Sequence, residues 1–202
     1  MNLRCKRLLF LLAIVASITA ASGADKKPFS PEPASSYENK QSNNGVTIAA
    51  EAYNSEDLAR TAFGNVNPYK HGILPVLVVI ENTSREAIRL EHMKVEFVGP
   101  DRVGIESTPA ADVPYTIGPE RPKLGRPSPI PGLGRRKKKN PLAGSEIAVR
   151  AFAAKMLPPG ESAHGFFYFQ TGYRNGSKLY LTDLEQASTG EKLLFFEIPL
   201  DQ

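Results

Sequence analysis

The stretch ILPVLVVI, residues 73–80, decides the fold class, because nearly every position in it is apolar. A short apolar run of this length, rich in β-branched residues, is typical of a strand that is covered on both faces. Pro75 stands near the start of the run, where the missing backbone N–H is tolerated. The stretch therefore predicts a central strand in a sheet.

The preceding residues predict a strand followed by a short helix. In residues 46–53, apolar side chains alternate with others between Val46 and Ala50, which is the spacing of a strand with one buried face. Ser55 is a residue type preferred at helix N-caps, and two acidic residues follow it in the favourable first turn. Gly64 is a natural stop for this helix.

The next segment, residues 87–98, contains a change of register. Apolar residues occupy even positions up to Leu90 and odd positions from Met93 onward. Because side chains alternate along a strand with period two, one flat strand cannot hold both sets on the same face. A bulge or break near residues 91–92 would restore the alignment.

The last part of the chain predicts one more helix and three strands. Residues 146–156 are rich in alanine with apolar residues at helical spacing, which favours a helix over the alternative of a strand. Residues 162–170 (SAHGFFYFQ) are an aromatic strand, apolar on both faces and therefore expected to be buried. Residues 178–184 and 192–200 flank a polar turn and predict a hairpin.

The stretches PVLVVIENTSREAI and LPPGESAHGFFYF, with the final FFEIPL, resemble the immunoglobulin-like (telokin-like) β-sandwich modules found in bacterial envelope proteins and lipoproteins. The resemblance implies a mainly β fold, an immunoglobulin-like sandwich. The residue patterns add two short helices and a long Pro/Gly/basic loop, and the helix of residues 146–156 and this loop depart from the family pattern. Modules of this kind mostly bind, space or present something, and the resemblance implies such a role here. The matching residues are turn and core signals, so they indicate the fold and not a chemical activity. The matching residues are Val76 to Ile80, Asn82, Leu157, Pro159, Gly160, Glu161, Gly165 and Phe169.

Residues 1–24 have the three-part layout of a secretory signal peptide. Three basic residues precede an apolar run over residues 8–18, and small residues follow. We expect cleavage after Ala24, with Ala21 as the next site and an uncleaved anchor as the alternative. The run is too short to span a bilayer, which needs about 20 residues, so we expect no transmembrane span after cleavage. The expected location is periplasmic or extracellular.

Two further segments flank or interrupt the expected domain of residues 46–202. Residues 25–45 are rich in proline, serine, asparagine and charge, and we interpret them as a flexible lead-in. Residues 108–144 hold eight prolines, five glycines and eight basic residues without a visible period, which indicates a disordered or functional insertion.

Export changes the charge and the redox chemistry of the chain. Loss of the three basic residues of the signal would lower the formal net charge from +4 to +1, which disfavours bulk nucleic-acid binding. The only cysteine, Cys5, also lies in the signal, so the remaining chain would have no thiol and no disulfide. Motifs for nucleotide binding and common hydrolases are missing from the sequence, and we expect neither an enzyme nor a cofactor.

The insertion carries the most prominent candidate for binding. Polybasic segments attract anionic lipid headgroups, and an acidic polysaccharide or an acidic envelope protein would serve equally well. The alternative is a solvated loop whose charge only prevents aggregation. The basic residues concerned are consecutive: Arg135, Arg136, Lys137, Lys138 and Lys139.

Two other functions stay open at this point. Imidazole and thioether ligands suit Cu(I), and His92, Met93, Met156 and His164 could supply them in a periplasmic copper carrier. The alternative places both methionines in the core and both histidines at the surface. A hydrolase with an unrecognised Ser/His/Asp site is the third possibility.

Overall fold

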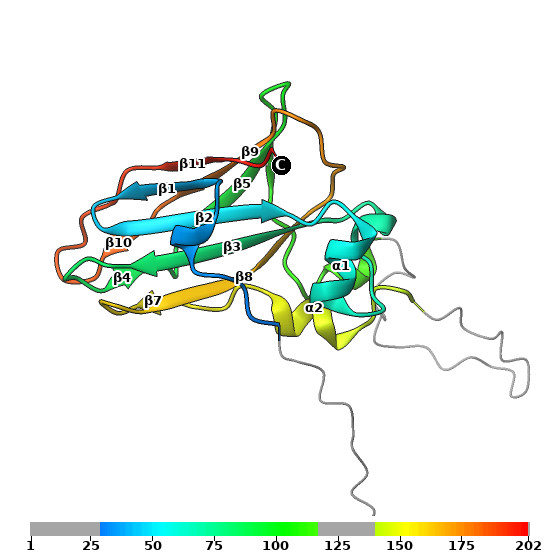
Figure 1. Ribbon diagram of the computed structural model, residues 1–202, viewed down its shortest axis with the longest axis horizontal. Coiled ribbons are helices and arrows are strands. Elements are labelled where there is room, and N and C mark those ends of the chain that lie inside the picture. The colour runs from blue at the N-terminus through cyan, green and yellow to red at the C-terminus, as the bar shows by residue number, and fades with distance from the viewer. Residues whose placement is uncertain (1–28, 117–139, 202) are drawn as a thin grey trace, which may run out of the picture.

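The computed structural model describes residues 29–116 and 140–201, and over these residues the protein is mainly β, with three antiparallel sheets and two α-helices (Figure 1). Sheet A has the strand order β1-β2-β3-β8. Its strands are β1 (Lys40–Asn43), β2 (Val46–Ala52), β3 (Leu74–Asn82) and β8 (Ser162–Phe169). The α-helices are α1 (Glu56–Phe63) and α2 (Ser145–Arg150).

Sheets B and C face sheet A across an apolar core to which all three sheets contribute. Sheet C has the order β11-β9-β5-β6, and the small sheet B has the order β10-β4-β7. The strands of sheet C are β5 (Lys94–Val98), β6 (Gly104–Glu106), β9 (Lys178–Thr182) and β11 (Phe196–Pro199). Those of sheet B are β4 (Ile88–Arg89), β7 (Met156–Leu157) and β10 (Glu185–Gln186). Three single turns of 3₁₀-helix are η1 (Ala34–Ser36), η2 (Tyr69–His71) and η3 (Val113–Tyr115).

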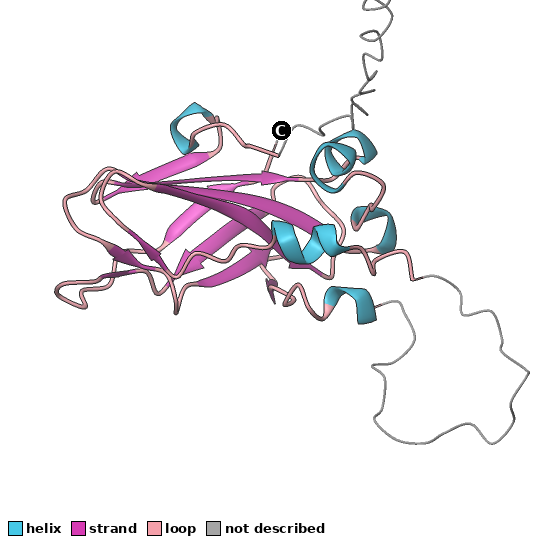
Figure 2. Cartoon of the chain, turned by 90° about the horizontal axis from the view of Figure 1, so that it is seen from below, coloured by secondary structure: helices cyan, strands magenta, loops and turns pink. Residues whose placement is uncertain are grey.

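Strand β3 is an inner strand of sheet A and is buried on both faces, which confirms the prediction from its sequence. Its residues alternate between two separate apolar clusters. Val76 and Val78 face the first core, which also contains residues of sheets B and C. Leu77 and Val79 face the second core, which lies between sheet A and the helices. Figure 2 shows both α-helices near one end of the strands.

The first core joins the inward faces of sheets A and C. Both sheets contribute alternate residues to it, such as Ile48 from sheet A and Phe97 from sheet C, each with no exposed surface. The second core contains aromatic side chains from α1 and β8, namely Phe63, Phe166 and Tyr168, together with Tyr53, which follows β2. Two sheets on either side of one core are compatible with a β-sandwich, while the immunoglobulin-like topology stays a prediction.

Asn82 joins the two sequence stretches that carry the resemblance. Its side-chain Nδ2 donates hydrogen bonds to the backbone carbonyls of Leu157 (3.0 Å) and Glu86 (2.8 Å). Its backbone N–H donates to the carbonyl of Glu161 (3.0 Å), and its carbonyl accepts from the N–H of Gly160 (2.7 Å). Asn82 is only 1% exposed, so these bonds are protected from water. The asparagine that ends β3 therefore fixes the LPPGE turn ahead of β8.

The predicted break near residues 91–92 is confirmed. A turn there separates β4 from β5, and the two strands belong to different sheets. Leu90 before the turn and Val95 after it both enter the first core. Even and odd positions can share one core because the chain changes sheets between them.

Helix α1 also follows its sequence signals. The Oγ of Ser55 accepts a hydrogen bond from the backbone N–H of Leu58 (3.2 Å), as an N-cap residue does. Gly64 ends the helix with a φ of +63°, a conformation that favours glycine. Ala59 and Phe63 turn into the second core.

The helix predicted over residues 146–156 is too long, because α2 ends at Arg150. Beyond it, the backbone N–H of Phe152 donates to the carbonyl of Phe166 (3.1 Å), so the chain runs along the free edge of β8. Gly165 permits this approach, since an added Cβ would lie 2.6 Å from the backbone nitrogen of Phe152. Val149 is 75% exposed, so the helical spacing of apolar residues did not mark a buried face.

The flexible lead-in expected over residues 25–45 is wrong for its later part. Strand β1 pairs with β2 through a two-residue hairpin turn at Asn44-Gly45, where both φ angles are positive. Ahead of it, the backbone N–H groups of Ala34 and Ser35 donate to the carboxylate of Glu81 (3.0 and 3.3 Å). The folded body thus begins before residue 46.

The predicted signal peptide, residues 1–24, lies outside the described residues. Within residues 29–116 and 140–201, no helix is both long and apolar enough to cross a membrane.

Candidate binding site

The basic run, residues 135–139, also lies outside the part of the chain that the structure describes, but the segments on either side of it are folded. Val113 and Leu142 are fully buried in the second core. The side-chain amide of Asn140 donates to the carbonyl of Pro114, and the backbone N–H of Leu142 donates to Oδ1 of Asn140 (2.9 Å). The described segments on either side of residues 117–139 are therefore held next to each other.

These contacts correct the expected limits of the insertion. The backbone N–H of Thr108 donates to the carbonyl of Tyr168 in β8 (2.6 Å), and η3 follows within the stretch that we expected to be disordered. Residues 108–116 and 140–144 belong to the fold. The sequence concealed this because isolated apolar residues among prolines, such as Val113 and Leu142, have no period.

The four candidate copper ligands differ in burial and in the direction of their side chains. His92 is exposed in the turn after β4, and Met93 packs against the first core. Met156 is 48% exposed on β7. His164 is exposed on β8, where its neighbour Ala163 packs against the first core, so His164 points to the opposite face of sheet A. Met93 and His164 therefore point to different sides, which argues against one site for all four, and the copper site stays a prediction.

Metal-ligating side chains do not cluster within the described ranges. No group of three or more His, Cys, Asp or Glu residues there could hold a metal ion. Burial and the nearby Arg150 guanidinium lower the pKa of His164, which favours its neutral form at pH 7. Among the residues that the structure describes, His164 has no hydrogen bond of the kind that orients a catalytic base, so the hydrolase alternative gains no support from it.

A shallow groove lies on the outer face of sheet C, which the sequence did not reveal. Its cavity volume is about 640 Å³. It is lined by residues of β5, β9 and the β5–β6 turn, among them Glu96, Arg102, Lys178 and Tyr180. Gly104 and two further glycines of the lining keep it open; a Cβ on Gly104 would lie 3.2 Å from the Glu96 carboxylate.

Glu197 of β11 organises the side chains next to the groove. Its carboxylate accepts hydrogen bonds from the Lys178 ammonium and from the Tyr180 hydroxyl (2.5 Å). The hydrogen bond from Lys178 lowers the pKa of Glu197, and the same bond raises the pKa of Lys178. The hydrogen bond to Glu197 raises the pKa of Tyr180, so its hydroxyl keeps its proton at neutral pH.

An aromatic pair continues this face beyond the groove. The rings of Tyr180 and Phe195 are stacked, with centroids 6.1 Å apart and planes 17° from parallel. Phe195 is 53% exposed, and the preceding Leu194 is 69% exposed. These two side chains form a small apolar surface next to the groove.

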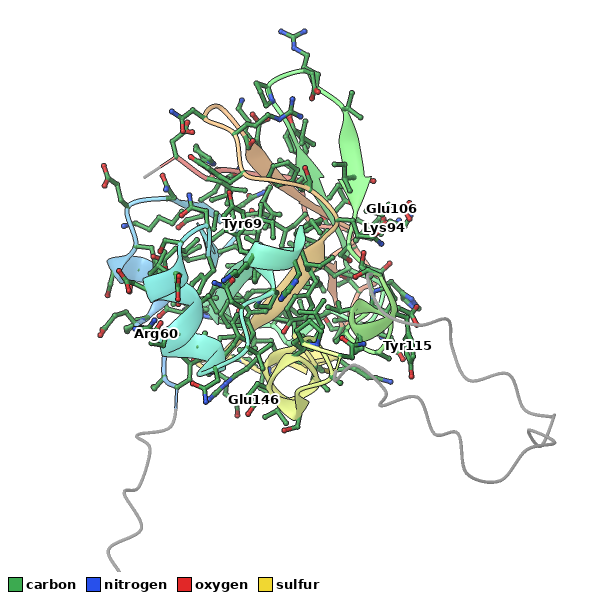
Figure 3. All side chains as sticks on the ribbon, turned by 90° about the vertical axis from the view of Figure 1, so that its right-hand side faces the viewer. Arg60, Tyr69, Lys94, Glu106, Tyr115 and Glu146 are labelled. Carbon is green, nitrogen blue, oxygen red and sulfur yellow. The ribbon has the colours of Figure 1, made fainter. Side chains whose placement is uncertain are left out.

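Most charges on the outer face of sheet C are paired. Asp183 bonds two lysines, Lys94 (3.1 Å) and Lys192 (2.7 Å), and these hydrogen bonds lower its pKa. Glu96 and Glu106 face each other across β5 and β6, and neither has a hydrogen bond or ion pair within the described residues. Figure 3 shows Lys94 and Glu106 on the strands of sheet C, apart from Arg60 of α1 and Glu146 of α2.

The sequence contained only a weak signal for this surface. In β5 and β9, polar residues alternate with the buried apolar ones, and this marks a solvent-facing side without indicating a groove. The turn VGPDRVG contains the one clearer hint. Arg102 there adopts a φ of +61°, which is uncommon for a residue with a Cβ.

No protein-family model and no curated protein matches this chain. Among solved structures, it is similar to the crystal structure of a "putative lipoprotein (ycdA)" from Bacillus subtilis, with 12% sequence identity and a TM-score of 0.37. The match covers 81% of this chain and 39% of that chain, so this chain spans well under half the length of that neighbour. At this TM-score the similarity supports no conclusion about fold or function.

Proposed function

We propose that this protein is an exported, non-catalytic binding module of the cell envelope that contacts anionic surfaces through residues 135–139. The observation that carries the proposal is the hydrogen bond from Asn140 to the Pro114 carbonyl, next to the buried Leu142. It holds the two ends of the basic insertion together on a folded body. In the sequence, the five consecutive cations end directly before Asn140, whose side chain is bonded to the folded body.

Electrostatics favour an anionic surface as the partner. Each basic residue near a charged membrane contributes about 1 kcal/mol, so five of them suffice for reversible attachment. The described part of the chain pairs most of its own cations with carboxylates, as Lys178 does with Glu197 and Arg174 with Asp101. By sequence, the formal positive charge is concentrated in the insertion.

The proposed body is an immunoglobulin-like β-sandwich, with sheets A and C on either side of the first core. Support comes from the core itself, to which both sheets contribute alternate residues, and from the bond between Asn82 and the Leu157 carbonyl that joins the two resembling stretches. The proposed location is the periplasm or the cell exterior, and it rests on the signal-like residues 1–24.

The experiment is co-sedimentation with vesicles of phosphatidylglycerol and phosphatidylcholine at 0.1 M salt. Replacing residues 135–139 with serine should lower the partition coefficient at least a hundredfold, from about 1 kcal/mol per residue. Replacing them all with lysine is the matched control, and it should retain binding because it preserves the charge. Raising the salt to 1 M, where the Debye length falls to about 3 Å, should release the intact chain. Equal retention of the serine variant would contradict the proposal.

A further inference from the structure

We propose that the outer face of sheet C is a second binding site, for a neutral polysaccharide chain. The site extends from the groove beside Glu96 and Arg102, across Tyr180, to the exposed ring of Phe195. It is separate from the basic insertion and does not depend on the function proposed for it.

The row of side chains across the sheet has the form of an extended site. The strand pairings align Glu106 with Glu96, Glu96 with Tyr180, and Tyr180 with Glu197, on four successive strands. At a spacing of about 4.8 Å between strands, the row is about 14 Å long. Sites for small ligands enclose most of the ligand, whereas this groove lies on an open sheet face and suits a chain that continues past both ends.

Charge argues for a ligand without net charge. Lys178, Arg174 and Lys94 are each matched by a carboxylate on the same face. The groove itself is lined by two cations, Arg102 and Lys178, and one carboxylate, Glu96. Lys178 is neutralised by Glu197, whereas neither Arg102 nor Glu96 has a partner within the described residues. A purely anionic or cationic ligand would meet repulsion from one of the two. Hydroxyl groups can donate to a carboxylate and accept from a guanidinium, so a polyhydroxyl ligand satisfies both.

The stacked rings of Tyr180 and Phe195 provide apolar contacts for a sugar ring. Sugar rings have an apolar C–H face, which packs against aromatic rings. Tyr180 is held in one orientation by its hydrogen bond to Glu197 and by its stack on Phe195, so little side-chain freedom is lost on binding. The half-exposed ring of Phe195 offers a surface next to the groove.

Two variants test the site without disturbing the fold. Arg102→Gly removes the guanidinium at a φ of +61°, a conformation that favours glycine, so it also relaxes the backbone. Phe195→Ala removes a ring that is 53% exposed. The matched control is Val149→Ala, which removes an apolar side chain that is 75% exposed on α2.

The measurement is affinity electrophoresis of the full chain in gels that contain dextran, laminarin, hydroxyethylcellulose or galactomannan. We expect at least one of these neutral polysaccharides to retard the protein. Arg102→Gly should weaken that binding at least about tenfold and Phe195→Ala about two- to tenfold, while Val149→Ala leaves it unchanged.

Three results would overturn the inference: no retardation by any of the four polysaccharides, equal retardation of both site variants and the intact chain, or binding that salt abolishes. Loss of retardation when residues 135–139 are replaced with serine would also overturn it, by assigning the binding to the basic insertion. That last result would leave the vesicle proposal standing, whereas failure on vesicles alone would leave the polysaccharide site standing.

Discussion

Replacement of Asn82 with alanine should destabilise the fold by about 2–4 kcal/mol. The substitution removes the hydrogen bond to the buried Leu157 carbonyl, and an unpaired buried acceptor costs about 1–3 kcal/mol. The Glu86 carbonyl is less affected, because the Ser84 hydroxyl lies 3.0 Å away and can donate its proton there once Asn82 Oδ1 is gone. Loss of the bonds that Asn82 Oδ1 accepts from Ser84 adds about 1 kcal/mol.

Urea unfolding followed by circular dichroism measures this effect. With an m-value of about 2 kcal/mol/M, the midpoint should fall by about 1–2 M. The matched control is Asn175→Ala, which changes an exposed asparagine in a different turn, Asn175-Gly176-Ser177, and should stay within about 0.5 kcal/mol of the intact chain.

Asn82→Asp separates hydrogen bonding from size. It keeps the side-chain shape but directs a carboxylate toward the Leu157 carbonyl, so at pH 7 it should destabilise more than alanine. Burial would raise the pKa of that carboxyl in the folded state, so the deficit should shrink as the pH falls toward 4 and the group gains a proton. If Asn82→Ala matched Asn175→Ala, or if the deficit of Asn82→Asp did not depend on pH, the account of this junction would be refuted.

Three further substitutions test other parts of the fold. Gly165→Ala should cost at least about 2 kcal/mol in urea unfolding, because its Cβ would collide with the backbone of Phe152, whereas Gly172→Ala has open space and should be neutral. Ser55→Ala should cost about 1 kcal/mol through loss of the N-cap bond, and Ser55→Asp should retain most of it. Burial raises the pKa of Glu51, and no cation in the described residues pairs with it, so the ionised form weakens the fold. Glu51→Gln should therefore raise the melting temperature at pH 8, and the gain should vanish at low pH, where Glu51 is protonated; a larger gain at low pH would contradict this reading.

The elements that could be predicted from sequence have strong local signals. Strand β3 is apolar at almost every position because both of its faces are buried, and such a run is hard to misinterpret. Helix α1 has its cap, first-turn acids and terminal glycine in sequence order. The break before β5 could be located because its side chains must share one core with those of β4.

The errors fell where long-range contacts override local composition. Residues 146–156 have alanine-rich helical composition, yet the bond from Phe152 to Phe166 along β8 takes the chain out of the helix. Strand β1 is polar because neither face is fully buried, although the Asn44-Gly45 pair was a usable hairpin signal. The groove on sheet C depends on which strands become neighbours, which spacing along one strand does not indicate.

The central claim, that the insertion attaches a folded module to an anionic envelope surface, is tested most directly by a deletion that leaves the fold intact. Val113 and Leu142 are buried, so only residues 117–139 should be replaced, and a short Gly/Ser linker can join Thr116 to Asn140 because Asn140 already bonds to Pro114. The measurement is the fraction of protein that sediments with purified native envelope membranes at 0.1 M salt. The account predicts that the intact chain sediments and that the linker variant stays in the supernatant with an unchanged melting temperature. Equal sedimentation of the two proteins would contradict it.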